Sequence, residues 1–131
     1  MKPKSLKMLI VDDDALISAM LQDFFKGFDY EFLTAEDGEE ALALCMSQKP
    51  DIVITDIMLP RMTGIELIKK LRSTDEFAVM PIIAFTAGSS VMRDEAKKAG
   101  AHMVLEKPVR RMELLQKVDE LLHATPFIRS T

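Results

Sequence analysis

This 131-residue chain contains four short apolar segments, and each is followed directly by a residue with a charged or hydroxyl side chain. These residues are Asp12 and Asp13 after residues 8–11, Asp56 after 52–55, Thr86 after 82–85, and Lys107 at the end of 103–106. Clustered carboxylates favour a hard cation, whereas a lysine and a threonine can contact an anionic group. The recurrence of such residues at one place in each segment predicts that they act together.

The segments that carry these residues have the pattern of buried parallel strands, because they are short, rich in Ile and Val, and separated by helix-length stretches. We expect strands at residues 7–11, 31–34, 52–55, 82–85 and 103–106. We expect helices at residues 14–26, 38–46, 65–72, 90–99 and 112–122. Asp14 is the expected N-cap of the first helix.

Five strand–helix units in alternation indicate an α/β fold with a doubly wound, five-stranded parallel sheet and helices on both faces. The flavodoxin-like strand order 2-1-3-4-5 fits best. In such a sheet the carboxyl ends of the strands share one edge, and ligands bind where the strand order reverses. That point lies between the first and third strands, so Asp12, Asp13 and Asp56 should meet there.

Composition narrows the class of protein. A hydrophobic content of 48% suits a globular domain, and a net charge of −4 argues against nucleic-acid binding. We expect a flexible segment at 1–6, one domain at 7–124 and a tail at 125–131. No apolar stretch approaches membrane-spanning length and no signal peptide is recognisable, so we expect no membrane partner and a cytoplasmic location. The single cysteine, Cys45, is expected to be a core residue.

Three neighbouring carboxylates repel one another, by about 4 kcal/mol for each pair 4 Å apart at an effective dielectric of 20. Raised carboxyl pKa values or a bound cation would relieve this repulsion, and oxygen ligands alone favour Mg²⁺. With Mg²⁺ and Lys107 present, the site could receive a phosphoryl group on a carboxylate. Asp56 is the best candidate nucleophile, because it stands alone on a central strand opposite the acidic pair.

Each residue also has a purely structural interpretation. Asp12, Asp13 and Asp14 could cap a helix, Asp56 could be a turn residue, and Thr86 could simply end a strand. The coincidence of all these residues at the same end of their strands favours the functional interpretation.

The motifs together resemble the receiver domain of two-component response regulators, over residues 7–123. The matching motifs are Val-Asp-Asp-Asp at 11–14, Asp-Ile-Val-Ile-Thr-Asp-Ile-Met-Leu-Pro at 51–60, Met-Thr-Gly at 62–64, Thr-Ala at 86–87 and Lys-Pro at 107–108. The resemblance implies that Asp56 is the phosphoacceptor. It implies that Asp13, Asp56 and the backbone carbonyl of Met58 bind Mg²⁺ directly, and that Asp12 helps to bind it through water. It further implies that Thr86, the backbone of Ala87, and Lys107 contact the phosphoryl group, and that the bond before Pro108 is cis.

Two departures from the family pattern are informative. Val104 stands where the family often has Tyr or Phe, so the usual coupling between that aromatic residue and the threonine is in doubt. The two positions that tune hydrolysis in the family hold Met58 and Gly88, and neither side chain can orient an attacking water. The resemblance therefore predicts slow self-dephosphorylation.

The resemblance implies a histidine kinase or a phosphotransfer protein as the phosphodonor. The output surface would comprise the helix at 90–99, the strand at 103–106 and the last helix, and it would face an unknown downstream protein. No turnover of a separate substrate is expected, so the chain would not be an enzyme in the usual sense. Phosphorylation-dependent dimerisation is left open.

Two alternatives from other functional classes stay open. The first is a receiver-like interaction module that never uses phosphate, which Val104 favours and the complete acidic set opposes. The second is a small aspartate-nucleophile phosphatase, suggested by the Asp-x-Asp spacing of Asp12 and Asp14. Leu16 stands where those enzymes have Thr or Val, which weakens the second alternative.

Overall fold

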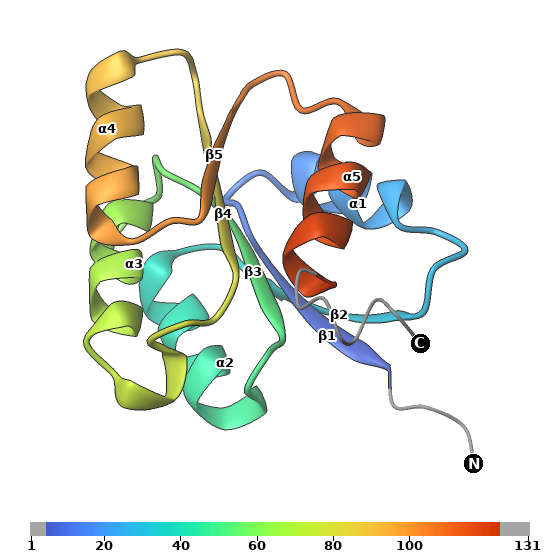
Figure 1. Ribbon diagram of the computed structural model, residues 1–131, viewed down its shortest axis with the longest axis horizontal. Helices are drawn as coiled ribbons and strands as arrows, with labels where there is room; N and C mark the ends of the chain where they lie inside the picture. The colour runs from blue at the N-terminus through green and yellow to red at the C-terminus, as the bar shows by residue number, and fades with distance from the viewer. Residues whose placement is uncertain (1–4, 124–131) are drawn as a thin grey trace.

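The computed structural model describes residues 5–123, and these build a twisted sheet with helices on both faces (Figure 1). The strands are β1 Leu6–Val11, β2 Tyr30–Ala35, β3 Ile52–Asp56, β4 Ile82–Thr86 and β5 Met103–Glu106. The helices are α1 Ala15–Phe24, α2 Gly38–Gln48, α3 Gly64–Arg72, the short 3₁₀ helix η1 Asp75–Phe77, α4 Ser90–Ala99 and α5 Arg111–Leu122. The strand order is β2-β1-β3-β4-β5 with every pair parallel, which confirms the predicted fold class.

The three central strands are buried because helices cover both faces of the sheet. Every residue of β3 and β4 is buried, as are the last four residues of β1. This explains why these segments are nearly continuous apolar runs rather than alternating ones. Strand β2 lies at the edge of the sheet and is only partly buried, which accounts for its weaker sequence signal.

Two hydrophobic cores lie on opposite faces of the sheet. Helices α2, α3 and α4 cover one face and contribute side chains such as Cys45, Ile68 and Ala96. Helices α1 and α5 cover the other face, where Leu21 and Val118 are buried (Figure 1). Cys45 is fully buried in the first of these cores, as predicted, and this burial raises the pKa of its thiol to about 12.

Local capping fixes where the helices begin. The Asp14 carboxylate accepts hydrogen bonds from the N–H groups of Leu16 and Ile17, which confirms it as the N-cap of α1. Thr63 and Glu66 form a capping box at the start of α3. Such caps satisfy the free N–H groups of the first helical turn.

The structure moves several predicted boundaries. Helix α1 ends at Phe24 rather than at residue 26, α2 continues to Gln48, and the 3₁₀ helix at Asp75–Phe77 was not predicted. No helix among residues 5–123 is long and apolar enough to cross a membrane. The predicted tail at 125–131 and most of the predicted segment at 1–6 lie outside the described residues.

Candidate functional site

The carboxyl edge of the sheet gathers the predicted site residues. Asp12 follows β1, Asp56 and Thr86 end β3 and β4, and Lys107 follows β5. The N–H of Lys107 donates to the Thr86 carbonyl at 2.8 Å, which ties the end of β5 to the end of β4. Asp12, Asp13 and Asp56 each place a carboxylate oxygen within 4.8 Å of the others, so the predicted convergence of the acidic residues is present.

Asp12 is the most constrained of the three acidic residues. Its side chain is buried, and its Oδ1 accepts a hydrogen bond from the Asp14 N–H at 2.8 Å. Its Oδ2 is buried without a hydrogen-bond partner among the described residues. Burial, followed by the nearby charge of Asp56, raises the pKa of the Asp12 carboxyl above its ordinary value. The site therefore holds an acidic oxygen that its own protein neighbours leave unpaired.

Asp56 lies in the middle of the cluster and is held by two neighbours. Lys107 Nζ lies 2.6 Å from Asp56 Oδ2, and the Met58 N–H donates to Asp56 Oδ1 at 3.1 Å. The Asp56 side chain is only 7% exposed, whereas that of Lys107 is 35% exposed. The lysine thus reaches from a more open position onto a carboxylate that is nearly buried.

These residues fit a divalent cation. All the donors are carboxylate or carbonyl oxygens, the ligands that Mg²⁺ prefers, and no histidine or cysteine belongs to the cluster. The buried Asp12 Oδ2 has no hydrogen-bond partner among the described residues, and leaving such an oxygen unpaired lowers the stability of the fold. A bound cation would supply the missing partner. Asp13 is exposed, so one side of the cluster is open to solvent.

The remaining residues predicted to contact the phosphoryl group lie beside this cluster. Thr86 is buried at the end of β4, whereas Ala87, which follows it, is exposed. Gly88 has a φ of +101° and open space where a side chain would stand. Met58 is 66% exposed on the other side of Asp56, so both positions expected to tune hydrolysis present no polar side chain.

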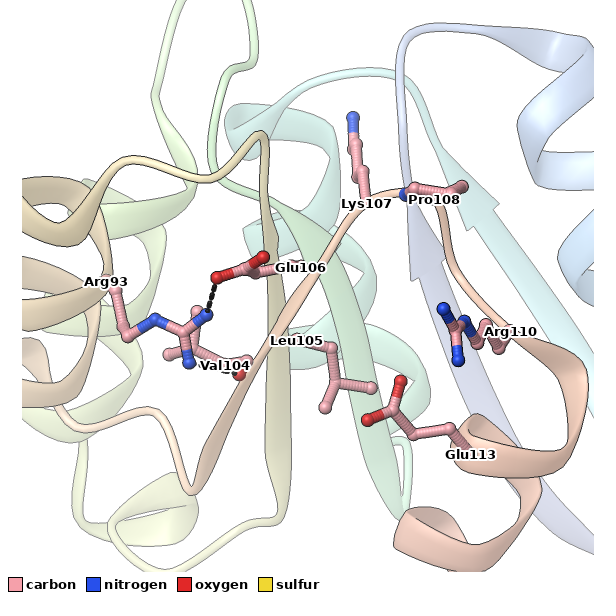
Figure 2. Close-up of a pocket in the computed structure, with 8 residues that line it drawn as sticks. All are labelled: Arg93, Val104, Leu105, Glu106, Lys107, Pro108, Arg110 and Glu113. Carbon is pink, nitrogen blue, oxygen red and sulfur yellow. Dashed lines mark hydrogen bonds and ion pairs between the residues drawn. The ribbon is translucent and has the colours of Figure 1, made fainter.

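Val104, which departs from the family pattern, is a residue of β5 and lies on that side of the site. Val104 is buried, and its carbonyl accepts a hydrogen bond from Arg93 of α4. A polar pocket of about 500 Å³ opens between α4 and the start of α5 (Figure 2). Figure 2 shows the Arg93–Glu106 ion pair on one wall, with Lys107 pointing away from it. The Lys107–Pro108 bond is cis, as the resemblance implied.

Two ion pairs near the site were not anticipated from the sequence. Arg93 Nη2 lies 2.6 Å from Glu106 Oε1, and Arg61 pairs with the buried Asp37. The partners are 13 and 24 residues apart, so no helical or strand periodicity connects them. The one available signal was the Asp-Gly-Glu-Glu run at 37–40, which marks Asp37 as an N-cap but gives no hint of its arginine.

Comparisons with known proteins agree with this geometry. A sequence profile described as "Response regulator receiver domain" matches residues 8–119. The response regulator MprA of Mycolicibacterium vanbaalenii is 39% identical over 121 residues, covering 92% of this chain and 52% of that protein. The chain therefore spans about half the length of the curated relatives it matches.

Solved structures extend the similarity to the fold. The chemotaxis response regulator CheY4 of Vibrio cholerae is 34% identical and superposes with a TM-score of 0.84, covering 91% of this chain and all of that one. The receiver domain of the Saccharomyces cerevisiae response regulator Ssk1, crystallised with the histidine phosphotransfer protein Ypd1, is 26% identical with a TM-score of 0.82. That match covers 89% of this chain and 88% of the other. With its strand order, its edge of acidic residues and its matching profile, this chain belongs to the receiver domain family of two-component response regulators.

Proposed function

We propose that this receiver domain accepts a phosphoryl group on Asp56, with Mg²⁺ bound at the acidic cluster, and signals by changing its α4-β5-α5 surface. The observation that carries the proposal is the environment of Asp56. Its carboxylate is nearly buried, lies within reach of two further carboxylates, and has Lys107 Nζ 2.6 Å from Oδ2. A lone structural aspartate would not need this set of neighbours.

The chemical step is a transfer between two side chains. An Asp56 carboxylate oxygen attacks the phosphorus of a phosphohistidine, a P–O bond forms, and the P–N bond to the imidazole breaks. The imidazole leaves with the electron pair and takes a proton from solvent. Lys107 then pairs with a phosphoryl oxygen, and the Thr86 hydroxyl and the Ala87 N–H donate hydrogen bonds to others.

Asp12, Asp13, Asp56 and the Met58 carbonyl are the residues that would hold Mg²⁺. When bound, this cation offsets negative charge on the carboxylates and on the transferring phosphoryl oxygens. The unpaired Asp12 Oδ2 supports this assignment.

The phosphodonor that we propose is a histidine kinase or a phosphotransfer protein. The similarity to the Ssk1 receiver, whose structure was solved with a phosphotransfer protein, supports that choice. Two adjacent ion pairs support the proposed output surface. Lys107, which pairs with Asp56, is the chain neighbour of Glu106, and Glu106 pairs with Arg93 on α4.

The experiment is treatment with a small acyl phosphate and MgCl₂, read by intact mass. We expect the parent to gain one phosphoryl group and Asp56→Asn to gain none. Chelation of the metal should abolish the gain in the parent. An unmodified parent would contradict the proposal and leave the phosphate-independent interaction module as the better interpretation.

The phosphorylated form should be long-lived. Met58, two residues after Asp56, and Gly88, two residues after Thr86, have no polar side chain to align an attacking water. Replacing Met58 with Asn should therefore shorten the phosphoryl lifetime in purified, Mg²⁺-loaded protein. A parent lifetime of seconds or less would show that another group aligns the water.

A further inference from the structure

The loop between β3 and α3, residues 57–63, carries the Met58 carbonyl and is closed at its base. The Ile57 N–H donates to the Phe85 carbonyl at 3.2 Å, and the Gly64 N–H donates to the Ile57 carbonyl at 2.9 Å. A Cβ at Gly64 would lie 2.3 Å from the Asp56 carbonyl oxygen, so the two ends of the loop are in close contact. The direction of the Met58 carbonyl then depends on how the middle of the loop is held.

The middle of this loop contains an unfavourable backbone conformation. Arg61 has a φ of +62°, in the left-handed region that non-glycine residues rarely adopt. Among residues 5–123 the other non-glycine residue with a positive φ is Lys49, which ends α2 as its C-cap, a usual place for this conformation. Arg61 ends no helix, and such a conformation persists only where surrounding contacts impose it.

Asp37 supplies one of these contacts. The Asp37 side chain is only 6% exposed, and its Oδ2 accepts hydrogen bonds from both Nε, at 3.0 Å, and Nη2 of Arg61. Its Oδ1 accepts the Glu40 N–H at 2.8 Å and caps α2. The Glu40 N–H, and then Arg61, hold the pKa of the Asp37 carboxyl below its ordinary value, so the carboxylate stays charged at neutral pH.

The start of α2 supplies a second contact with the same loop. The Gly38 N–H donates to the Met62 carbonyl at 3.2 Å. A Cβ at Gly38 would lie 2.4 Å from that carbonyl oxygen, so only glycine allows the approach. The N-cap and the first residue of α2 thus hold the loop at both Arg61 and Met62. Neither Asp37 nor Arg61 belongs to the acidic cluster.

We propose that Asp37 and Arg61 are positioning residues for the metal site. Their ion pair holds the left-handed turn at Arg61 and so aims the Met58 carbonyl at the cation. The inference rests on the proposed function, because it assumes that this carbonyl is a Mg²⁺ ligand. Partners outside the ligand set commonly change metal affinity by about 10-fold or more when removed.

A purely structural role is the competing interpretation. The pair is half-buried, because the Arg61 side chain is 62% exposed and that of Asp37 only 6%, so it can also stabilise the fold. A structural pair would shift the unfolding temperature and leave the Mg²⁺ dissociation constant of the folded protein unchanged. A positioning pair must change that constant at temperatures where each variant is folded.

The test is calorimetric titration of MgCl₂ into the parent, Arg61→Ala, Asp37→Asn and the double variant. We expect each single variant to bind Mg²⁺ about 10-fold more weakly. The double variant should bind no more weakly than either single variant, because both changes break one contact. Arg61→Lys, which keeps the charge but not the fork of donors, should recover part of the loss.

Lys49→Ala is the matched control. Lys49 also has a positive φ and pairs with a carboxylate, Glu76, at 2.6 Å, but it lies at the opposite end of β3 from Asp56. Its loss should leave Mg²⁺ binding unchanged. Asn at position 37 preserves the helix cap, so Asp37→Asn serves the test even if Arg61→Ala unfolds.

Three different results would overturn the inference. Dissociation constants within twofold of the parent in Arg61→Ala and Asp37→Asn would remove the positioning role and leave the proposed function intact. A parent that binds no Mg²⁺ would remove both. A loss in Lys49→Ala equal to that in Arg61→Ala would also overturn the inference, because the effect would then be general destabilisation.

Discussion

The two ends of the parallel sheet use polar groups in opposite ways. At the carboxyl edge, three carboxylates share a small space, and one buried oxygen of Asp12 has no partner among the described residues. At the amino end of β4 and β5, a half-buried polar network centres on Arg72 at the end of α3, whose guanidinium donates to three backbone carbonyls. We propose that the carboxyl edge receives a ligand, whereas the Arg72 network at the other end helps to hold the fold together.

The Arg72 network is formed almost entirely with backbone groups. The guanidinium donates to the carbonyls of Gly100, Phe77 and Met80 at 3.0, 2.7 and 2.8 Å, and approaches His102 Nδ1 at 3.1 Å. The Ile82 N–H donates to the same His102 nitrogen at 3.2 Å. Because both partners of Nδ1 are donors, the neutral imidazole with a free Nδ1 lone pair fits this position.

The contrast between the acidic cluster and the Arg72 network indicates which polar groups stabilise the fold and which serve function. A network whose donors and acceptors are paired stabilises the native state, and removing one member leaves the others unsatisfied. A cluster of like charges lowers stability and is retained for what it binds. Substitutions at the two ends should therefore have opposite effects on the free energy of unfolding.

The largest effect is expected for Arg72→Ala. The change removes the donors of three half-buried carbonyl hydrogen bonds, at about 1 kcal/mol each, so the free energy of unfolding should fall by up to about 3 kcal/mol. Urea denaturation followed by circular dichroism measures this loss. The folded fraction should still be phosphorylated by an acyl phosphate, since Arg72 is remote from Asp56. A loss below about 1 kcal/mol would show that water replaces the guanidinium at little cost.

A smaller effect of opposite sign is expected for Asp12→Asn. The Asn amide can donate toward the neighbouring carboxylates where Asp12 Oδ2 has no partner, so the metal-free protein should gain about 1 kcal/mol at pH 7. The same variant should bind Mg²⁺ more weakly. Urea denaturation in the presence of a chelator measures the first effect, and calorimetry measures the second.

The pH dependence of this gain is set by the raised pKa of Asp12. A carboxyl whose pKa is higher in the folded state favours folding below its ordinary value of 3.8 and loses that contribution as the pH rises through the folded pKa. The advantage of Asp12→Asn should therefore be present at pH 7 and shrink on acidification. A gain that is independent of pH would contradict an electrostatic origin.

The smallest effect is expected at His102. Burial, and then the charges of Arg72 and Lys97, hold the pKa of His102 below its ordinary value of 6.5. Its contribution to stability should be complete above that value and be lost as the pH falls through the lower folded pKa. His102→Asn keeps a hydrogen-bond acceptor near the position of Nδ1 but removes the titrating imidazole. The free energy of unfolding of this variant should therefore change less between pH 7 and pH 5 than that of the parent. His123→Asn, at the C-cap of α5, is the control for the other histidine.

Much of the fold followed from sequence patterns that are local. Buried runs such as Ile52–Thr55, and the cap at Asp14, are read within a few residues, and the parallel arrangement follows from their alternation with helices. The acidic cluster was predictable for the same reason, because parallel strands bring their carboxyl ends to one edge. The 3₁₀ helix at Asp75–Phe77 was missed, since three residues offer no periodicity.

The sequence by itself determined the strand order and which residues share the functional edge, because both follow from hydrophobic periodicity and the handedness of the connections. Only the tertiary structure decided which side chains from different strands, helices and loops pair with one another. Asp37 meets Arg61, Arg72 meets His102, and Lys107 meets Asp56 across 24, 30 and 51 residues. Such contacts depend on loop conformations and side-chain rotamers, which are set once the layers have packed and which no local pattern of residues encodes.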